Sequence, residues 1–417
     1  MEGQLIQDLK SIQKASRKLI AVSDDQKKKI LNEVADLALK NEQIILDANQ
    51  KDLDRMDPAD PKYDRLLLNT ARLQSITEDM RRVADLPNPL GEVLEEHTKE
   101  NGLHIARIAV PIGVIGVVYE SRPNVTFDVF ALTFKTGNAC VLKGSRDAAD
   151  SNGAIVAIIR EVLSKYQLED TVLLAPAERE ALPTILTAEG LVDCIIPRGS
   201  QGLIGFVRKN ASIPVIETGA GIVHTYVDTA ADLDKAKSIV TNAKTRRVSV
   251  CNALDCLVVH VDRLKDLPEI MKGLDAEHSV KVHADDRSYE ELKEVYNPDL
   301  LARAAEGDFG VEWLSYQMSI KVVDSLDEAL EHIALYSSKH SEAIVSENQE
   351  AIDVFLQQVD AACVYANAST AFSDGGEFGL GAEIGISTQK LHARGPMGLR
   401  EITSYKWVVR GDGQVRS

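Results

Sequence analysis

Short apolar runs alternate with helix-like segments over most of this 417-residue chain, and this alternation restricts the possible folds more than any other feature. Residues 110–119, 139–143 and 171–174 are apolar, and residues 125–135 and 148–165 between them have helical spacing. Further apolar runs follow at residues 193–196, 215–216, 222–226, 254–261 and 319–323. Parallel strands are connected through helices that cover both faces of the sheet. The sequence therefore predicts an α/β fold with parallel sheets.

The two ends of the chain differ from this pattern. Three N-terminal segments have apolar residues at helical spacing and predict helices: residues 4–22, residues 25–47 after a Ser23-Asp24 cap signal, and residues 73–86. Residues 92–109 predict two strands joined by an Asn101-Gly102 turn, and residues 403–409 predict a final strand. Because an exposed hairpin has an edge to cover, we expect the final strand to partner the hairpin of a neighbouring subunit in a homo-oligomer.

Charge and cysteine content narrow the class of protein. Lys plus Arg number 47 against 64 Asp plus Glu, which gives a net charge of −17, and the cations are scattered rather than grouped in a stripe. This argues against nucleic-acid binding. The five cysteines are odd in number and lack the paired spacing of a zinc site, so we predict a reducing compartment and no metal centre.

The apolar segments do not have the pattern of a signal peptide or a membrane span. Asp8, Lys10 and Lys14 interrupt the apolar residues near the N-terminus. The longest apolar run, residues 108–119, is shorter than the roughly 20 residues of a membrane helix, and Pro111 interrupts it. We therefore expect a cytoplasmic enzyme without membrane contact.

The stretch from Thr245 to Cys256 is the candidate catalytic segment. Cys251 follows a stretch with alternating apolar residues, and Arg246 and Arg247 lie upstream of it. A thiolate is the nucleophilic form of cysteine, and nearby positive charge populates it by lowering the pKa of a thiol. The alternative is that Cys251 and Cys256 are small buried residues of a strand, and the stretch by itself favours that interpretation.

Two loops are suited to a dinucleotide, although no G-x-G-x-x-G pattern follows the first strand. At Lys143, Ser145 and Arg146 a strand ends just before a helix, where cations and backbone N–H groups can bind a phosphate or ribose. Gly199 and Ser200 lie in a second loop before a helix, which suits a pyrophosphate. Solvated turns without a ligand are the alternative for both loops.

Two polar residues at strand ends are candidates for the chemistry. Glu217 opens a Glu-Thr-Gly-Ala-Gly turn, and a carboxylate near a cysteine can act as a base. The alternative for Glu217 is a solvated side chain. Asn124 ends a Ser-Arg-Pro-Asn segment, and its amide is able to donate to a developing oxyanion. The alternative, which the segment alone favours, is that Asn124 caps the next helix.

The order of these motifs resembles the aldehyde dehydrogenase superfamily over nearly the whole chain. Residues 323–344 further resemble the signature of the gamma-glutamyl phosphate reductase family, as do residues 121–124, 217–221 and 394–399. The resemblance implies an aldehyde dehydrogenase-like α/β fold with two parallel-sheet domains, an oligomerisation hairpin and a C-terminal strand. The expected parts are N-terminal helices with an NADP-binding domain (residues 1–100 and 110–228), a catalytic domain (229–390) and an oligomerisation segment (101–109 and 391–417).

The resemblance also implies the reaction. Cys251 would attack L-glutamyl 5-phosphate and release phosphate, and NADPH would reduce the thioester to L-glutamate 5-semialdehyde for proline biosynthesis. Asn124 and the Cys251 backbone N–H would stabilise the oxyanion, and Glu217 aligns with the superfamily's general base. The family places Lys143 at the adenosine ribose, Ser200 at the pyrophosphate and Glu312 at the nicotinamide ribose.

Arg146 bears on the choice of cofactor. NAD-preferring members of the superfamily often carry a glutamate here, whose carboxylate accepts from the ribose 2′-hydroxyl, whereas an arginine favours the 2′-phosphate of NADP(H). We therefore predict NADP(H). Three arginines are candidates for the substrate phosphate: Arg122, Arg246 and Arg247.

Glu217 is unexpected in a reductase, because a base that activates water would hydrolyse the thioester. We therefore expect Glu217 either to turn away from the thioester or to deprotonate Cys251. Glu312 is followed by Trp313-Leu314, where the superfamily usually has Ile-Phe. His332 and His340 lie in the family signature, and we interpret both as hydrogen-bonding scaffold residues.

Two other functions stay open on the sequence. A hydrolytic aldehyde dehydrogenase is favoured by Glu217 and opposed by the signature at residues 323–344. A catalytically silent scaffold that binds a partner such as glutamate kinase is opposed by the joint presence of Cys251, Asn124 and Lys143.

Overall fold

The computed structural model describes residues 2–60 and 62–416, and the chain divides into two compact units. The first unit comprises Met1–Thr218, Gly379–Gly385 and Met397–Ser417. The second comprises Gly219–Phe378 and Ile386–Pro396. Each unit therefore combines a long continuous segment with short pieces from the C-terminal part of the chain.

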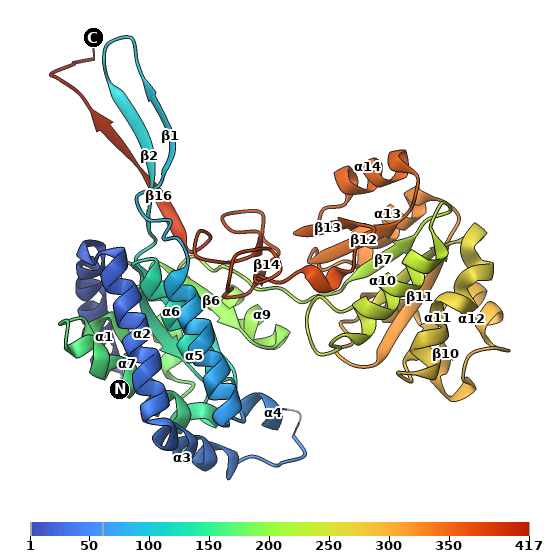
Figure 1. Ribbon diagram of the computed structural model, residues 1–417, viewed down its shortest axis with the longest axis horizontal. Helices are drawn as coiled ribbons and strands as arrows, with labels where there is room; N and C mark the ends of the chain where they lie inside the picture. Colours follow the sequence, from blue (N-terminus) through green and yellow to red (C-terminus); the bar gives the residue numbers. More distant parts are fainter. Residues whose placement is uncertain (1, 61, 417) are drawn as a thin grey trace. The chain divides into compact units, whose positions relative to one another are not determined.

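The first unit begins with helices, as predicted (blue in Figure 1): α1 (Glu2–Ser16), α2 (Asp24–Lys40), α3 (Glu42–Leu53), α4 (Tyr63–Leu66) and α5 (Thr70–Asp85). The cap signal is confirmed, because the Ser23 side chain accepts a hydrogen bond from the Gln26 N–H. The predicted helix over residues 25–47 is instead divided between two helices, because the backbone at Asn41 leaves the helical conformation.

A four-stranded parallel sheet forms the core of the first unit, in the order β5-β4-β3-β6. Its strands are β3 (Val114–Tyr119), β4 (Ala139–Lys143), β5 (Val172–Leu174) and β6 (Cys194–Arg198). The connecting helices are α6 (Asn124–Lys135), α7 (Ala149–Ser164), α8 (Ala181–Leu186) and α9 (Gln201–Asn210). Every residue of β3 and β4 is buried, as the continuous apolar runs predict. The predicted strand at 215–216 is an isolated bridge between Val215 and Ile195.

A three-stranded antiparallel sheet also belongs to the first unit. It contains β1 (Val93–Thr98), β2 (His104–Pro111) and β16 (Thr403–Arg410), in the order β1-β2-β16. Gly102 has a φ of 86° in the turn between β1 and β2, so the predicted hairpin is confirmed. Strand β16 lies beside β2 of the same chain along its whole length (Figure 1). Strand β16 therefore partners the hairpin of its own chain on this side, and pairing with a neighbouring subunit stays a prediction for its other edge.

The second unit is built on a seven-stranded sheet in the order β10-β9-β11-β8-β7-β12-β13, and all of its pairings are parallel. Its strands are β7 (His224–Val227), β8 (Cys256–His260), β9 (Lys281–Ala284), β10 (Leu301–Arg303), β11 (Gln317–Val323), β12 (Ser341–Val345) and β13 (Cys363–Ala366). Its helices are α10 (Leu233–Thr245), α11 (Leu267–Ala276), α12 (Asp286–Leu292), α13 (Leu326–Tyr336) and α14 (Gln349–Gln358). Strands β14 (Ile386–Ser387) and β15 (Gly395–Pro396) form a small antiparallel pair. The predicted α/β fold with parallel sheets is confirmed.

Short 3₁₀ helices complete the connections: η1 (Arg17–Ala21), η2 (Arg146–Ala148), η3 (Glu169–Thr171), η4 (Val261–Asp266), η5 (Pro298–Leu300), η6 (Glu306–Gly310) and η7 (Thr370–Phe372). In the part of the chain that the structure describes, no helix has the length and apolar character that crossing a membrane requires.

Candidate active site

Cys251 lies in the second unit, in the turn that leads from α10 into β8. Its side chain is half-buried, and its backbone packs directly against Gly221. A Cβ atom at Gly221 would lie 1.6 Å from the Cys251 carbonyl oxygen, so any side chain there would push the cysteine loop away. The last glycine of the Glu-Thr-Gly-Ala-Gly turn is therefore required for the position of Cys251.

Two carboxylates, the partly buried Glu312 and the buried Asp255, hold the segments around this loop. The Gly221 N–H donates to Glu312 Oε1 at 2.9 Å, so Glu312 anchors the turn that supports Cys251. Asp255, four residues after Cys251, accepts the Trp313 N–H at 3.0 Å, and burial raises the pKa of Asp255. Lys244 donates to the Leu254 carbonyl at 2.8 Å, and burial lowers the pKa of this lysine. Hydrogen bonds between side chains and main-chain groups thus hold the segments that flank the cysteine loop.

Arg246 and Arg247 begin the loop that carries Cys251. Arg246 is the residue that follows α10, and both side chains are exposed. Neither guanidinium is engaged by a hydrogen bond or ion pair with another described residue, so both can bind an anion without first losing a partner. Guanidinium groups bind phosphate in a bidentate manner, which suits both residues to an anionic leaving group.

Asn124 is the first residue of α6 in the first unit, and it does not cap that helix. Its Nδ2 donates to Asp128 Oδ2 at 3.1 Å, one helical turn further on. The capping alternative is therefore wrong. Burial raises the pKa of Asp128 to about 7. The contact uses one of the two N–H bonds of the Asn124 amide, so the second is left for another acceptor. Arg122 is half-buried in the preceding turn.

Lys143, Ser145 and Arg146 lie at the end of β4 and in the turn that follows it. The nearly buried Lys143 ammonium donates to the carbonyls of Gly144 at 3.0 Å and Ala177 at 3.1 Å, and burial lowers its pKa. The Ser145 hydroxyl lies 3.4 Å from that of Ser121. Arg146 is exposed, and its Nη2 lies 3.8 Å from a carboxylate oxygen of Glu180. A long, exposed ion pair of this kind contributes little to stability, so the Arg146 guanidinium can leave Glu180 and bind a phosphate.

The second predicted loop already binds an anionic group. Ser200 is the N-cap of α9, and both its N–H and its hydroxyl donate to the Glu120 carboxylate, at 2.9 and 2.7 Å. A Cβ at Gly199 would lie 2.8 Å from Glu120 Cδ, so the glycine permits this close approach. A helix N-terminus attracts negative charge. Glu120 therefore stands where the sequence predicts a pyrophosphate, which shows that this loop fits an anion.

Glu217 is directed toward α9 within the first unit. Its Oε2 lies 3.6 Å from Nη1 of Arg208, and the Glu217 side chain is largely buried. The carboxylate is therefore neutralised by a cation of its own unit. This ion pair was not anticipated from the sequence.

His340 is a scaffold residue, as interpreted from the sequence. Its Nδ1 lies 2.8 Å from the Ser341 hydroxyl, which contacts the Ser373 hydroxyl at 2.5 Å. Tyr365 joins the same chain at 2.8 Å from Ser373. Burial lowers the pKa of His340 to about 4, so the ring is neutral near pH 7.

The structure assigns the predicted site residues to both units. Those in the second unit are Cys251, Arg246, Arg247 and Glu312; those in the first are Asn124, Glu217, Lys143, Ser145, Arg146, Gly199, Ser200 and Arg122. Sequence reasoning missed Glu120, Asp128 and Arg208 as partners of these residues. It also missed Asp255, which accepts the Trp313 N–H. The only signals for them were local: Glu120 directly precedes the Ser-Arg-Pro-Asn segment, and Asp128 lies four residues after Asn124.

No protein-family model matches the chain. The gamma-glutamyl phosphate reductase of Chlorobium phaeobacteroides is 58% identical to it over 418 residues, which cover 100% of both proteins. The crystal structure of gamma-glutamyl phosphate reductase from Thermotoga maritima has a TM-score of 0.95 and 42% identity, covering 99% of this chain and 100% of the other.

More distant solved structures share the fold. An acetylating aldehyde dehydrogenase from Geobacillus thermoglucosidasius has a TM-score of 0.68 at 17% identity and covers 100% of this chain and 99% of its own. An engineered glycolyl-CoA reductase with bound NADP+ has a TM-score of 0.68 at 14% identity, covering 97% of this chain and 96% of its own. The predicted aldehyde dehydrogenase-like fold is confirmed.

Proposed function

The chain belongs to the gamma-glutamyl phosphate reductase family, and on this premise we propose that it reduces L-glutamyl 5-phosphate to L-glutamate 5-semialdehyde and phosphate, in proline biosynthesis. One observation carries the proposal. A half-buried thiol, Cys251, lies in a loop that packs on Gly221 and begins with two exposed arginines.

The reaction has two stages at Cys251. The thiolate attacks the acyl carbonyl, and phosphate leaves with the electrons of its bond to that carbon, so a thioester forms. A bound nicotinamide supplies the hydride that reduces the thioester. The tetrahedral oxyanion that results re-forms the carbonyl, expels the Cys251 thiolate and releases the aldehyde. Arg246, Arg247 and Arg122 are the proposed cations for the departing phosphate.

Asn124 is the proposed side-chain donor to the oxyanion, with the Cys251 backbone N–H as the main-chain donor. The hydrogen bond from Asn124 to Asp128 supports this role, because it fixes the amide plane and leaves one N–H unused. Asp128 acts through Asn124 and is a positioning residue.

Glu217 pairs with Arg208, which supports the first of its two expected roles, namely a carboxylate directed away from the thioester. The hydrolytic aldehyde dehydrogenase is accordingly the less favoured function.

Phosphate dependence tests the proposed function. With the cyclic pyrroline, which equilibrates with the semialdehyde, we expect NADP+ reduction to require inorganic phosphate, because phosphate must release the acyl group from Cys251. The initial rate at 340 nm is compared with and without phosphate, with sulfate as an ionic-strength control. A hydrolytic enzyme would turn over equally well without phosphate, and such a result would reject the proposal.

The cofactor is a nicotinamide dinucleotide, and NADPH is our specific proposal. Lys143 and Ser145 are the proposed contacts of the adenosine ribose, Ser200 and Gly199 those of the pyrophosphate, and Glu312 that of the nicotinamide ribose. Arg146 supports NADPH because its exposed guanidinium is held by one long ion pair and is able to take a 2′-phosphate.

Arg146→Glu is expected to raise the KM for NADPH by about 10- to 100-fold and to change the KM for NADH little, since the loss of a charge-assisted contact amounts to about 1.5–3 kcal/mol. Steady-state kinetics with NADPH and with NADH measure the two KM values. Arg160→Glu is the matched control, because Arg160 is an exposed arginine of α7 that pairs with Asp170. Equal effects of Arg146→Glu on both cofactors would contradict the assignment.

Glu120→Gln is expected to tighten NADPH binding by about 2- to 5-fold, which corresponds to the 0.3–1 kcal/mol of a charge at a helix end. The proposed pyrophosphate and the Glu120 carboxylate compete for the same Ser200 groups. Fluorescence titration of NADPH gives the Kd, with the exposed Glu189→Gln as control. Weaker binding by Glu120→Gln would mean that Glu120 assists the cofactor instead.

We further propose the first unit as the cofactor-binding part of the chain and the second unit as the catalytic part. The first unit's long segment ends at Thr218 rather than at the predicted residue 228, because β7 (His224–Val227) belongs to the seven-stranded sheet of the second unit. The β1-β2-β16 sheet exposes Tyr405, Trp407 and Val409 by about half, which supports its proposed role in a homo-oligomer. The remaining proposals are a cytoplasmic location and a glutamate kinase as the source of the acyl phosphate.

A further inference from the structure

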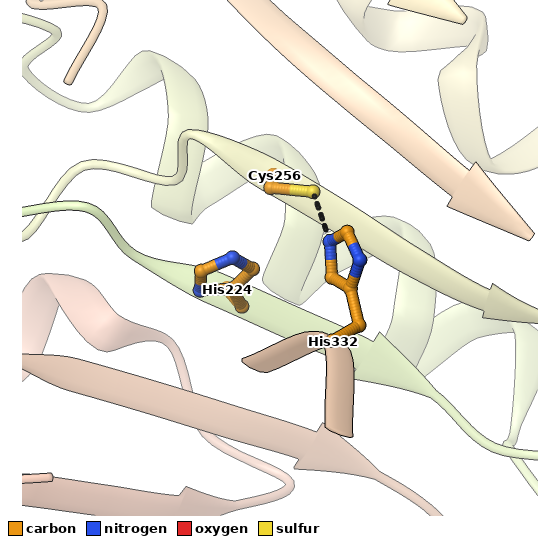
Figure 2. A group of neighbouring side chains, drawn as sticks. All are labelled: His224, Cys256 and His332. Atoms are coloured by element: carbon orange, nitrogen blue, oxygen red, sulfur yellow. Dashed lines mark hydrogen bonds between the residues drawn. The ribbon is translucent and has the colours of Figure 1, made fainter. Parts of the chain in front are cut away.

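Three buried side chains of the second unit point toward one another: His224, Cys256 and His332 (Figure 2). His224 and Cys256 are the first residues of the adjacent parallel strands β7 and β8, and they are paired in register. His332 comes from α13. Cys256 Sγ lies 3.6 Å from His332 Nε2, and the potential ligand atoms of all three residues lie within 4.8 Å of one another.

His224 is held in a specific orientation. Its Nδ1 lies 3.0 Å from Glu342 Oε2, and the His224 backbone N–H donates to the same oxygen at 2.9 Å. The Ser337 hydroxyl donates to the other oxygen of Glu342. Because a carboxylate accepts, Nδ1 carries a proton, and in the neutral ring Nε2 presents a lone pair.

That lone pair has no hydrogen-bond partner among the described residues, and the whole His224 side chain is excluded from solvent. A buried acceptor without a donor is unfavourable, and native proteins rarely keep one without a reason. A histidine whose Nδ1–H donates to a carboxylate while Nε2 is bare has the arrangement that proteins use to orient a metal-binding imidazole.

The distance between Cys256 and His332 also suits a metal ion, and the remaining ligand atoms, which lie within 4.8 Å of one another, would move closer on binding. With a Zn–S distance of about 2.3 Å and a Zn–N distance of about 2.0–2.1 Å, a tetrahedral site places sulfur and nitrogen about 3.6 Å apart. The Cys256–His332 distance already has this value. Thiolate and imidazole favour zinc or copper(I) over the hard cations magnesium and calcium.

We propose that His224, Cys256 and His332 bind one d¹⁰ cation of the Zn²⁺ or Cu⁺ type. On binding, the Cys256 thiol gives its proton to solvent and both histidines bind as neutral imidazoles. The ion ties β7, β8 and α13 together. Strand β7 follows the turn that contains Gly221, and β8 follows the Cys251 loop, so the ion stabilises the base of the nucleophile's support and takes no part in the chemistry.

The metal content of the full-length protein tests this proposal. The protein is produced in medium supplemented with Zn²⁺ or with copper, washed with a chelator and analysed by plasma mass spectrometry. We expect about one ion per chain from one of the two media, and the stoichiometry in each medium distinguishes zinc from copper.

Matched variants assign the ion to these residues. Cys256→Ser and His224→Gln should each lose it, whereas Cys363→Ser, which changes another buried cysteine of the same sheet, should retain it. Cys251→Ala should also retain it, which separates the site from the reactive thiol. Cobalt(II) added during refolding of the unaltered protein should give a thiolate charge-transfer band that is lost in Cys256→Ser.

Two results would overturn the proposal. One is metal-free protein from both media together with no charge-transfer band after refolding with cobalt(II), which would leave an S–H···N hydrogen bond between Cys256 and His332. The other is full metal retention in Cys256→Ser. The measurement on the unaltered protein decides the matter even if a variant does not fold.

Discussion

Cys251→Ala is expected to lose turnover by at least about 10⁴-fold, because removal of a covalent nucleophile leaves only binding and oxyanion stabilisation. Without the thiol, the acyl group of L-glutamyl 5-phosphate has no acceptor and no thioester forms. The loss should appear in both directions, as phosphate-dependent NADP+ reduction and as NADPH oxidation. NADPH affinity and the thermal midpoint should change little, because the half-buried side chain becomes only slightly smaller.

Cys363→Ala is the control for Cys251→Ala. Cys363 is a buried cysteine of β13 in the same unit, so its loss tests whether removal of a thiol from this sheet is harmful in itself. We expect it to keep its activity within a few-fold, with a modest loss of stability from the small cavity. Activity of Cys251→Ala within tenfold of the unaltered protein would reject the thioester mechanism.

The elements that the sequence predicted well are those whose signals are local. Continuous apolar runs marked β3 and β4, because strands buried on both faces need apolar residues throughout. The Asn101-Gly102 turn marked the hairpin, because Gly102 adopts a positive φ. The position of Lys143 at the end of a strand was also predicted, because the apolar run before it marks β4.

Contacts between distant segments left no such signal. Glu312 bonds the Gly221 N–H across 91 residues, and Glu120 reaches Ser200 across 80. A carboxylate in the sequence does not indicate which backbone N–H it will accept from. Glu312 was therefore assigned another role, and Glu120 was assigned none. The same reason explains β16, whose alternating pattern predicted a strand but could not distinguish its own hairpin from that of a neighbour.

The buried trio of His224, Cys256 and His332 shows the limit of spacing rules in particular. Zinc motifs are recognised when ligands lie a few residues apart, but Cys256 and His332 are separated by 76 residues. Register between β7 and β8 brings His224 beside Cys256, and only the sheet order defines that register. The predicted absence of a metal centre therefore rested on sequence spacing alone.

Asn124→Ala is expected to lower kcat by about 100- to 1,000-fold, the usual effect of removing one oxyanion donor. The KM for L-glutamyl 5-phosphate should change much less, because the oxyanion develops only as the thiolate adds to the carbonyl. The Kd for NADPH should be unchanged. Because Asn124 does not cap α6 but donates to Asp128, its removal should lower the thermal midpoint through the loss of that hydrogen bond and not through the loss of a cap.

The hydrogen bond between Asn124 and Asp128 allows a second test of Asn124 as the oxyanion donor. Asp128→Asn removes the carboxylate that accepts from Asn124 Nδ2 at 3.1 Å and keeps the shape of the side chain. If Asp128 fixes the amide, kcat should fall by less than in Asn124→Ala, and the double variant should be no worse than Asn124→Ala alone, because both changes act on one group. Asn32→Ala, in α2, is the control for asparagine removal elsewhere in the unit. Additive losses would mean that Asp128 acts on the reaction independently of Asn124, and an unchanged kcat in Asn124→Ala would exclude the amide as the oxyanion donor.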